Sequence, residues 1–317
     1  MNRKETNVAR SARAVLEQVS RVVVGKDSQL MWTLAAILAR GHILLEDIPG
    51  VGKTTMALSF SRTLDLDYAR VQFTPDVLPS DVTGYSILNQ ADGAMVYQPG
   101  AVLCNLFLAD ELNRATSRTQ SALLEAMEEG QVTVDGISHR LPQPFVVIAT
   151  QNPTGAAGTQ LLPDSQMDRF MVRLSLGYPD PADEIAMVLN RQNGNPLQTL
   201  RPLLTRDKLM ELQELVDQTH ISEEVVGYIV KLVSETRSHP EIHRGASPRA
   251  TLAVVAMAKA WARLQDRDYV IPADVREVFP ITLAHRLILT TQAESQGRTP
   301  AGLLTTILGK VAPPKLR

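Results

Sequence analysis

The chain has 317 residues and a formal net charge of −2, with 44% apolar and 21% charged residues. This composition is typical of a folded globular protein, and the length predicts one large domain accompanied by a smaller one. A nearly neutral chain gives no electrostatic reason to expect nucleic acid or an anionic membrane as the main partner.

Cysteine and histidine usage argues against a disulfide framework and a thiolate metal site. The only cysteine is Cys104, which lies in an apolar stretch and is expected to pack as a small hydrophobic residue. His239 and His243 have a spacing found in zinc sites, but Pro240 lies between them and no carboxylate pattern completes such a site.

Membrane insertion is not expected, because no apolar run approaches the roughly 20 residues that cross a bilayer. The first residues also lack the continuous apolar run of a secretory signal. We therefore expect a cytoplasmic protein without a transmembrane segment.

The first half of the chain alternates helical and strand patterns. Spaced apolar residues predict an amphipathic helix over 8–20, and Met31–Leu38 predicts a buried helix that ends at Gly41. Five short runs are continuously apolar, as in the buried strands of a largely parallel sheet. These runs are Ile43–Leu45, Val71–Phe73, Leu106–Ala109, Phe145–Ala149 and Met171–Leu176.

Helical patterns separate these strands, the clearest being Thr119–Glu129 with Gly130 as its terminator. Two hairpins are expected as insertions, at about Ser86–Tyr97 around Asp92-Gly93 and at about Gln131–Leu141 around Asp135-Gly136. The alternation of strands and helices predicts an α/β domain over residues 1–180.

After Pro181 the patterns are helical, which predicts an α-helical domain over residues 181–317. Leu252–Leu264 is apolar on nearly all sides and is expected to be the central helix of a small bundle. Pro272 suits the first turn of the next helix, and Pro280 is expected to break that helix. Apolar residues at helical spacing predict two further helices, through Leu209, Leu212 and Val216 and through Val226, Ile229, Val230 and Val233.

The strongest motif is Gly50-Val51-Gly52-Lys53-Thr54-Thr55, between the strand Ile43–Leu45 and a helical segment Met56–Leu64. Glycines let successive backbone N–H groups turn around an anion, and the following helix directs its positive end to the same place. We therefore predict a phosphate-binding loop for ATP over Pro49–Thr55. Lys53 would reach the β- and γ-phosphates, and the hydroxyl of Thr54 would ligate Mg²⁺.

One position departs from the usual Gly-x₄-Gly-Lys-Thr string, because Asp47 stands at its first glycine. That glycine mainly eases the turn, and Pro49-Gly50 can supply the same turn.

Polar residues follow two other predicted strands. Asp110 and Glu111 come directly after Leu106–Ala109, and ligands of parallel sheets bind at the carboxyl ends of strands. Asp110 would hold Mg²⁺ through water, and Glu111 would take a proton from the attacking water or polarise it. Asn152 follows another strand; it would sense the γ-phosphate, or it only caps a turn before Pro153.

Together these motifs resemble the MoxR family of AAA+ ATPases, in the family's order from about residue 18 to residue 290. Asp47 fits the resemblance, because the family usually has Glu-Asp at that point. The matching segments are Leu45–Thr54, Gln72–Asp76, Pro79–Gly84, Ala109–Ala115, Thr119–Met127, Ala149–Pro153, Asp168–Phe170 and Gly245–Arg249.

The resemblance implies an AAA+ core with a parallel five-stranded sheet and inserted hairpins, followed by a small helical lid domain. It implies a sensor at Asn152, an arginine finger at Arg169 that acts on the ATP of a neighbouring subunit, and a second sensor at Arg249 in the lid. It also implies that Arg114 reaches the subunit interface. Adenine contacts are implied near Val23, Val24 and Gly25.

Two of these roles have simpler alternatives. Arg169 follows Asp168 and would otherwise form a surface ion pair with it, of little energetic value. Arg249 follows Ser247-Pro248 and would otherwise belong to the cap of a helix.

For function, the resemblance implies a homohexamer in which ATP hydrolysis at subunit interfaces remodels a protein client. Family roles include maturation of a client, insertion of a metal cofactor and assembly of complexes, often beside a protein with a von Willebrand factor A domain. The sequence does not identify the client.

Two alternatives stay open: a nucleic-acid motor like the MCM helicases, which share the inserted hairpins, and a nucleotide-dependent scaffold that does not hydrolyse ATP. The near-neutral charge and the lack of a Lys/Arg cluster in the hairpins argue against the first. Glu111 argues against the second.

Overall fold

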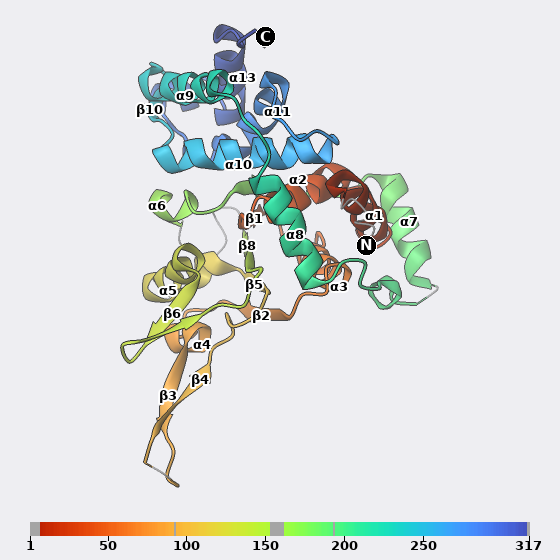
Figure 1. Cartoon of the computed structure of the whole chain (residues 1–317), viewed down its shortest axis with the longest axis vertical. Helices are drawn as coiled ribbons and strands as arrows, with labels where there is room; N and C mark the ends of the chain where they lie inside the picture. Colours follow the sequence, from red (N-terminus) through yellow and green to blue (C-terminus); the bar gives the residue numbers. More distant parts are fainter. Residues whose placement is uncertain (1–6, 92, 153–161, 193, 316–317) are drawn as a thin grey trace, which may run out of the picture.

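The computed structural model describes residues 7–91, 93–152, 162–192 and 194–315, and Figure 1 shows the arrangement of their elements. The N-terminal part of the chain consists of α1 (Val8–Ser20), α2 (Asp27–Leu38), β1 (Ile43–Glu46), α3 (Lys53–Thr63), β2 (Tyr68–Gln72), α4 (Pro79–Thr83), β3 (Gly84–Leu88), β4 (Met95–Pro99), β5 (Leu106–Asp110), the 3-10 helix η1 (Leu112–Arg114), α5 (Ser117–Glu129), β6 (Gln131–Val134), β7 (Ile137–Arg140), β8 (Val146–Gln151), α6 (Asp164–Met167) and β9 (Val172–Leu174).

The C-terminal part is mainly helical. It consists of α7 (Pro181–Gln192), η2 (Pro196–Thr199), α8 (Arg206–Asp217), α9 (Glu223–Ser238), β10 (Ile242–Arg244), α10 (Pro248–Leu264), α11 (Pro272–Leu283), η3 (Ala284–Arg286), β11 (Ile288–Leu289), α12 (Thr291–Ser295) and α13 (Pro300–Lys310).

A five-stranded sheet with the order β2-β5-β8-β1-β9 forms the centre of the first part, and all its pairings are parallel. The expected α/β core with a parallel five-stranded sheet is therefore confirmed. The predicted strand Val71–Phe73 has the wrong limits, since β2 starts at Tyr68 and ends at Gln72. β2 is an edge strand, and none of its residues is buried. Its first half therefore lacks the apolar run that marks the inner strands.

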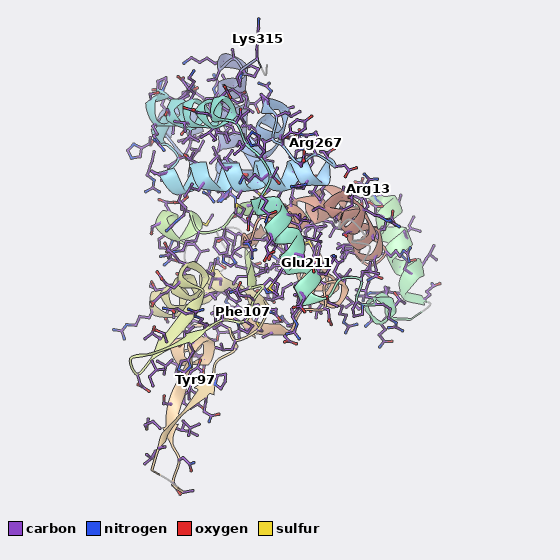
Figure 2. All side chains as sticks on the ribbon, viewed as in Figure 1. Arg13, Tyr97, Phe107, Glu211, Arg267 and Lys315 are labelled. Atoms are coloured by element: carbon purple, nitrogen blue, oxygen red, sulfur yellow. The ribbon has the colours of Figure 1, made fainter. Side chains whose placement is uncertain are left out.

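The inner strands are apolar on both faces because helices or loops cover both sides of the sheet. In β1, Ile43 and Leu45 join one buried cluster, which includes apolar residues of α1, α2 and α3, whereas Leu44 joins the other. In β5, Phe107 belongs to the second cluster, with residues of α5, and Figure 2 shows it inside the molecule. Burial on both faces explains why the sequence reads as continuous rather than alternating.

Both expected hairpins are present. β3 pairs with β4 and β6 pairs with β7, antiparallel in each case, and the β3–β4 hairpin extends away from the core in Figure 1. Asp135 and Gly136 have φ values of 50° and 78°, as a two-residue turn of type I′ requires. Asp92 of the other predicted turn lies outside the described residues, and that hairpin begins at Gly84 rather than at Ser86.

The helical part is organised around α10, as the apolar run Leu252–Leu264 predicts. α10 packs against α9 and α11 on one side and against α1, α2 and α8 on the other (Figure 1). Trp32 of α2 stacks on Trp261 of α10, with ring centroids 4.6 Å apart. α10 therefore joins the helical part to the N-terminal helices of the core.

Pro280 does not break α11, contrary to the prediction, because the helix continues to Leu283. A proline inside a helix removes one N–H donor and crowds the preceding turn. Here Phe279 and Leu283 are fully buried, and the N–H of Ala284 still donates to the carbonyl of Pro280. Tertiary packing of this face outweighs the local preference.

The apolar face predicted for α9 is partly wrong. Val230 is 46% exposed and Val226 is half-buried, whereas Val225, Tyr228 and Leu232 are buried beside the predicted Ile229 and Val233.

The burial expected for Cys104 and the absence of a membrane-spanning run can also be compared with the structure. Cys104 packs in the core, and burial raises the pKa of its thiol to about 12. No helix within the described ranges is long and apolar enough to cross a bilayer.

Candidate functional site

The polar residues predicted for the site come together at one edge of the sheet. β1, β5 and β8 are parallel neighbours, so their carboxyl ends lie side by side. The phosphate-binding loop follows β1, Glu111 follows β5, and Asn152 follows β8. Pro153 lies outside the described residues.

The loop between β1 and α3 has the backbone that its glycines predict. Gly50 and Gly52 have φ values of 87° and 99°, in the left-handed region that disfavours other residues. A Cβ atom at either position would meet no atom within 4 Å, so the loop surrounds open space. α3 starts at Lys53, and its 11 residues direct the positive end of the helix dipole into this space.

Lys53 is buried beside the loop. Its Nζ donates to the carbonyl of Asp47 at 2.6 Å and to that of Ile48 at 3.3 Å. Burial lowers the pKa of Lys53 from its ordinary value, and the carboxylates of Asp47, Asp110 and Glu111 oppose this change. Lys53 is thus a cation held by neutral carbonyls at the base of the loop.

Asp47 has a structural reason to stand where many such loops have glycine. Its Oδ2 accepts from the backbone N–H of Leu176, from that of Gly177 at 2.8 Å and from the hydroxyl of Ser175 at 3.1 Å. Its Oδ1 accepts from the N–H of Ile48 at 3.1 Å. Asp47 therefore connects the start of the loop to the segment that leads from β9 towards α7.

Asp110 is paired on both carboxylate oxygens. Oδ1 accepts from the hydroxyl of Thr150 at 2.6 Å, and Oδ2 accepts from Nε and Nη2 of Arg70 at 3.1 and 2.6 Å. Arg70 is on the neighbouring strand β2, one position before Val71 of the predicted run. No sequence motif points to Arg70, and a cation within a short strand was its only signal.

Glu111 adopts a left-handed backbone, with φ 56°, directly after β5. Its Oε2 accepts from Nη1 of Arg114 at 2.8 Å, and its Oε1 accepts from Nδ2 of Asn152 at 3.1 Å. The hydrogen bond from Arg114 lowers the pKa of Glu111, burial opposes it, and Asn152 lowers it further. Glu111 is consequently held as a carboxylate, and Arg114 contacts it within the same chain.

These residues line a cavity of about 360 Å³ that opens to solvent. Its lining consists of Pro49, Gly50, Gly52, Lys53, Thr54, Thr55, Arg70, Gln72, Asp110, Glu111 and Asn152. A backbone cradle, a lysine and two carboxylates in one cavity suit a phosphate chain accompanied by a divalent cation.

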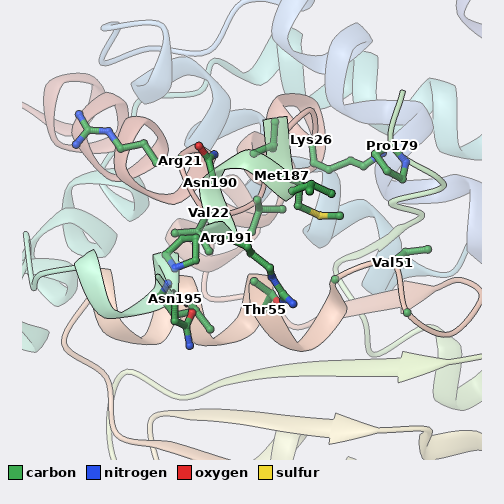
Figure 3. Close-up of a pocket in the computed structure, with 17 residues that line it drawn as sticks. Arg21, Val22, Lys26, Val51, Thr55, Pro179, Met187, Asn190, Arg191 and Asn195 are labelled. Atoms are coloured by element: carbon green, nitrogen blue, oxygen red, sulfur yellow. Dashed lines mark hydrogen bonds between the residues drawn. The ribbon is translucent and has the colours of Figure 1, made fainter. Parts of the chain in front are cut away.

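A second cavity of about 380 Å³ adjoins the first, because Gly50, Gly52 and Thr55 line both. Figure 3 shows its lining from three segments: the turn after α1, the loop before α3 with the first turn of that helix, and α7 with residues on either side of it. Val23, Val24 and Val51 give it apolar walls, and Asn190 and Asn195 are among its polar groups. Apolar walls with a few polar groups suit a nucleoside.

Gly25, the third predicted adenine contact, does not line this cavity and instead makes room for α7. A Cβ atom at Gly25 would lie 1.9 Å from Oδ2 of Asp183, and its φ is 70°. Next to it, Nζ of Lys26 donates to the carbonyl of Tyr178 at 2.9 Å. The turn after α1 therefore holds the segment that covers the cavity.

Arg169 and Arg249 lie together, but they are not among the residues that line the two cavities. Nε of Arg169 donates to Oε2 of Glu128 at 2.9 Å, and Nη2 of Arg249 donates to Oε1 of the same carboxylate. Arg169 also follows Asp168, but Asp168 pairs with Ser247 and Arg286, not with Arg169. The simpler alternative, a surface ion pair between Arg169 and Asp168, is not formed, and Arg169 pairs with Glu128 instead. Nothing in the sequence pointed to Glu128.

The residues fit ATP with Mg²⁺. The loop glycines leave open space for phosphate, and the hydroxyl of Thr54 and the carboxylate of Asp110 are hard oxygen donors of the kind that Mg²⁺ prefers. The described residues contain no group of three or more His, Cys, Asp or Glu side chains that would hold a metal by themselves. A divalent cation at this site would also need oxygens from the phosphates of the nucleotide.

Comparison with known proteins also indicates an ATPase. Residues 42–172 match the ATPase family associated with various cellular activities (AAA), and residues 234–307 match the AAA lid domain. The chain is 44% identical to YeaC of Bacillus subtilis over 302 residues, which cover 95% of this chain and 94% of YeaC. It is 39% identical to chaperone MoxR1 of Mycobacterium tuberculosis over 96% of this chain and 82% of that protein.

The fold agrees with a solved structure, that of a candidate ATPase from Cytophaga hutchinsonii. The two have a TM-score of 0.90 and 39% identity, and the match covers 97% of this chain and 96% of the other. The family match, the fold and the residues at the sheet edge agree, and the chain belongs to the MoxR family of AAA+ ATPases.

Proposed function

We propose that this ATPase binds ATP with Mg²⁺ and hydrolyses it at the interface between two copies of the chain. One observation carries the proposal: Lys53, Asp110, Glu111 and Asn152 share a cavity, whereas Arg169 and Arg249 lie together outside it. A chain with both halves of a site in different places completes the site by head-to-tail assembly.

The cavity that takes the nucleotide is the acceptor half of the shared site. In it, Pro49–Thr55 surrounds the phosphates, and Lys53 neutralises part of their charge. Val23 and Val24 contact the adenine in the adjoining cavity. Thr54 and Asp110 hold Mg²⁺, which would supply charge neutralisation and orientation of the phosphates.

Glu111 accepts the proton of the attacking water. Its lowered pKa keeps it ionised at neutral pH, and the hydrogen bonds from Arg114 and Asn152 fix both of its oxygens. Asn152 is close enough to Glu111 to act also as the sensor that the family resemblance implies.

Arg169 and Arg249 form the donor half of the shared site. Arg169 stabilises the charge that develops on the phosphates of the ATP bound by the neighbouring subunit. Arg249 accompanies it, because both guanidinium groups bind one carboxylate. An arginine supplied across an interface contributes roughly 10³–10⁵ in rate, or about 4–7 kcal/mol of the barrier.

At the level of the assembly, we propose a homohexamer with an α/β domain over residues 1–180 and a helical lid domain over 181–317. Hydrolysis would move the lid against the core and so remodel, mature or assemble a protein client, including by insertion of a metal cofactor. The name of the relative chaperone MoxR1 supports a chaperone role. A von Willebrand factor A domain protein as partner rests on the resemblance alone.

Mixed rings test the interface. Lys53→Ala should abolish ATP binding, and Arg169→Ala should leave binding intact but lower turnover by roughly 10³-fold or more. Rings that contain both variants should hydrolyse ATP faster than either variant alone, because an intact pocket then meets an intact arginine. No recovery in rings shown to be mixed would refute the shared site.

The same assays separate the alternatives. A tenfold rise in turnover on adding DNA would favour a nucleic-acid motor, although Arg140 is the one Arg or Lys in the described strands of the two hairpins. Absence of phosphate release from assembled rings would favour a scaffold. Glu111→Gln should retain ATP without hydrolysing it, and a pull-down with this variant would identify the client.

A further inference from the structure

The two arginines of the donor half come from different parts of the fold and meet at one carboxylate. Arg169 follows α6 of the core, and Arg249 lies in the first turn of α10 in the helical part. Glu128, near the end of α5, offers one oxygen to each of them. Two guanidinium groups this close repel each other, and the shared carboxylate offsets that repulsion.

The side chains of residues next to the two arginines are linked as well. Asp168, directly before Arg169, accepts at 2.8 Å from the hydroxyl of Ser247, and Ser247 is the N-cap of α10. Asp168 also pairs with Arg286 at 3.2 Å, and Arg286 is buried. The starting points of both arginine side chains are thus held together, and Glu128 remains to orient the two head groups.

Stabilisation of the fold is a poor explanation for the Glu128 contacts. The side chains of Arg169, Arg249 and Glu128 are 27%, 44% and 37% exposed, and ion pairs with such exposure contribute little to folding. Partial exposure leaves the guanidinium groups accessible to an anion on another molecule. The geometry is therefore better explained by positioning than by stability.

We propose that Glu128 is a positioning residue that holds Arg169 and Arg249 as a pair for the nucleotide of the neighbouring subunit. This inference rests on the proposed function. Glu128 touches neither of the cavities of its own chain, so it acts on the site of the next subunit through the two arginines.

The chain offers a matched control. Glu129 follows Glu128 in α5 and is also exposed, and the described part of the chain provides no hydrogen bond or ion pair for its carboxylate. Glu128→Gln and Glu129→Gln remove the same charge one residue apart. A difference between them reports the contact with the arginines and not the charge of the surface.

The first experiment measures turnover and binding of MgATP in assembled rings. Glu128→Gln should lower kcat by about 10- to 100-fold, because a misplacement of about 1 Å costs on the order of 10² in rate. KM for ATP should change less than about threefold, since the residues of the pocket are intact. Glu129→Gln should match the wild type. An unchanged or increased kcat would overturn the proposal, an increase meaning that Glu128 competes with the phosphates.

The second experiment shows on which subunit Glu128 acts. Rings mixed from Glu128→Gln and Lys53→Ala chains should exceed both parents in turnover, because the Lys53→Ala chain still presents its paired arginines. Recovery with Arg169→Ala and Lys53→Ala but not with Glu128→Gln would overturn this inference alone. No recovery in either mixture would refute the shared site itself.

Folding and assembly are checked on the same samples. Glu128→Gln should keep the melting temperature and the ring size of the wild type. A variant that folds but no longer forms rings would assign Glu128 to subunit contact and would also overturn the proposal.

Discussion

Arg70 and Asp110 form a two-bond contact across neighbouring strands, with Nε and Nη2 of the arginine 3.1 and 2.6 Å from Oδ2 of the carboxylate. Asp110 is the residue proposed to hold Mg²⁺, so Arg70 occupies one of its oxygens with a positive charge of the chain itself. Metal binding at Asp110 would then compete with this ion pair.

Removing Arg70 is expected to make the metal bind more readily. In Arg70→Gln the Mg²⁺ concentration for half-maximal binding of a fluorescent ATP analogue should fall about 3- to 10-fold, or about 1 kcal/mol. Arg206→Gln is a suitable control, because Arg206 pairs with Asp67 away from the cavity. A higher Mg²⁺ requirement would show that Arg70 supports the site instead of competing for it.

Asp47→Asn should destabilise the protein. The carboxylate accepts four hydrogen bonds, from Ile48, Ser175, Leu176 and Gly177. An amide turns one acceptor into a donor, which leaves at least one of these donors without its partner. We expect the free energy of unfolding to fall by about 1–3 kcal/mol.

Urea unfolding followed by tryptophan fluorescence measures this change, since Trp32 and Trp261 stack where α2 meets α10. The exposed Asp76, for which the described residues provide no side-chain hydrogen bond, supplies the control Asp76→Asn. Equal stability of the two variants would contradict a structural role for the Asp47 carboxylate.

Gly25→Ala should weaken ATP binding. Its Cβ atom would lie 1.9 Å from Oδ2 and 3.1 Å from Cβ of Asp183, so Asp183 in the first turn of α7 must shift, and α7 lines the cavity proposed for the nucleoside. An increase of about tenfold in Kd for ATP, or about 1.4 kcal/mol, is expected in a binding titration.

Two variants separate this collision from backbone strain. Gly136 also has a positive φ but would meet no atom within 4 Å, so Gly136→Ala should leave Kd unchanged. The double change Gly25→Ala with Asp183→Ala should recover part of the affinity, with a strain of about 1–2 kcal/mol remaining. No recovery in the double variant would mean that the collision is not the cause.

Acid should destabilise the fold through His42. Its Nδ1 accepts from the N–H of Val147 at 3.0 Å, so this nitrogen must be unprotonated, and burial lowers its pKa to about 4. The unfolded chain, with an ordinary pKa of about 6.5, binds a proton first. Stability is therefore fully present above pH 6.5 and decreases as the pH falls to about 4, by about 3 kcal/mol.

Denaturant unfolding at several pH values checks this expectation. Substituting His42 with Asn should reduce the slope between pH 6.5 and 4, even if the variant is less stable at every pH. Part of the slope should persist, because His285 is also buried with a lowered pKa. An unchanged slope in the variant would show that His42 does not control the acid sensitivity.

Local patterns were sufficient for much of the fold. Continuous apolar runs identified the inner strands, Asp135-Gly136 identified a hairpin turn, and Gly130 marked the end of α5. The limits of β2 and the effect of Pro280 on α11 were predicted wrongly for a common reason. The environment of an edge strand and the packing of a buried helix face depend on tertiary contacts, which neighbouring residues in the sequence do not reveal.

The sequence by itself determined which residues make up the proposed acceptor half of the site. Lys53, Asp110 and Glu111 belong to short motifs at the ends of strands, and parallel strands bring such ends to one edge. Only the tertiary structure decided how these residues are paired and what surrounds them. Arg70, Glu128 and Asp183 became visible there, because each meets its partner through contacts between segments distant in sequence, and no local periodicity records such contacts.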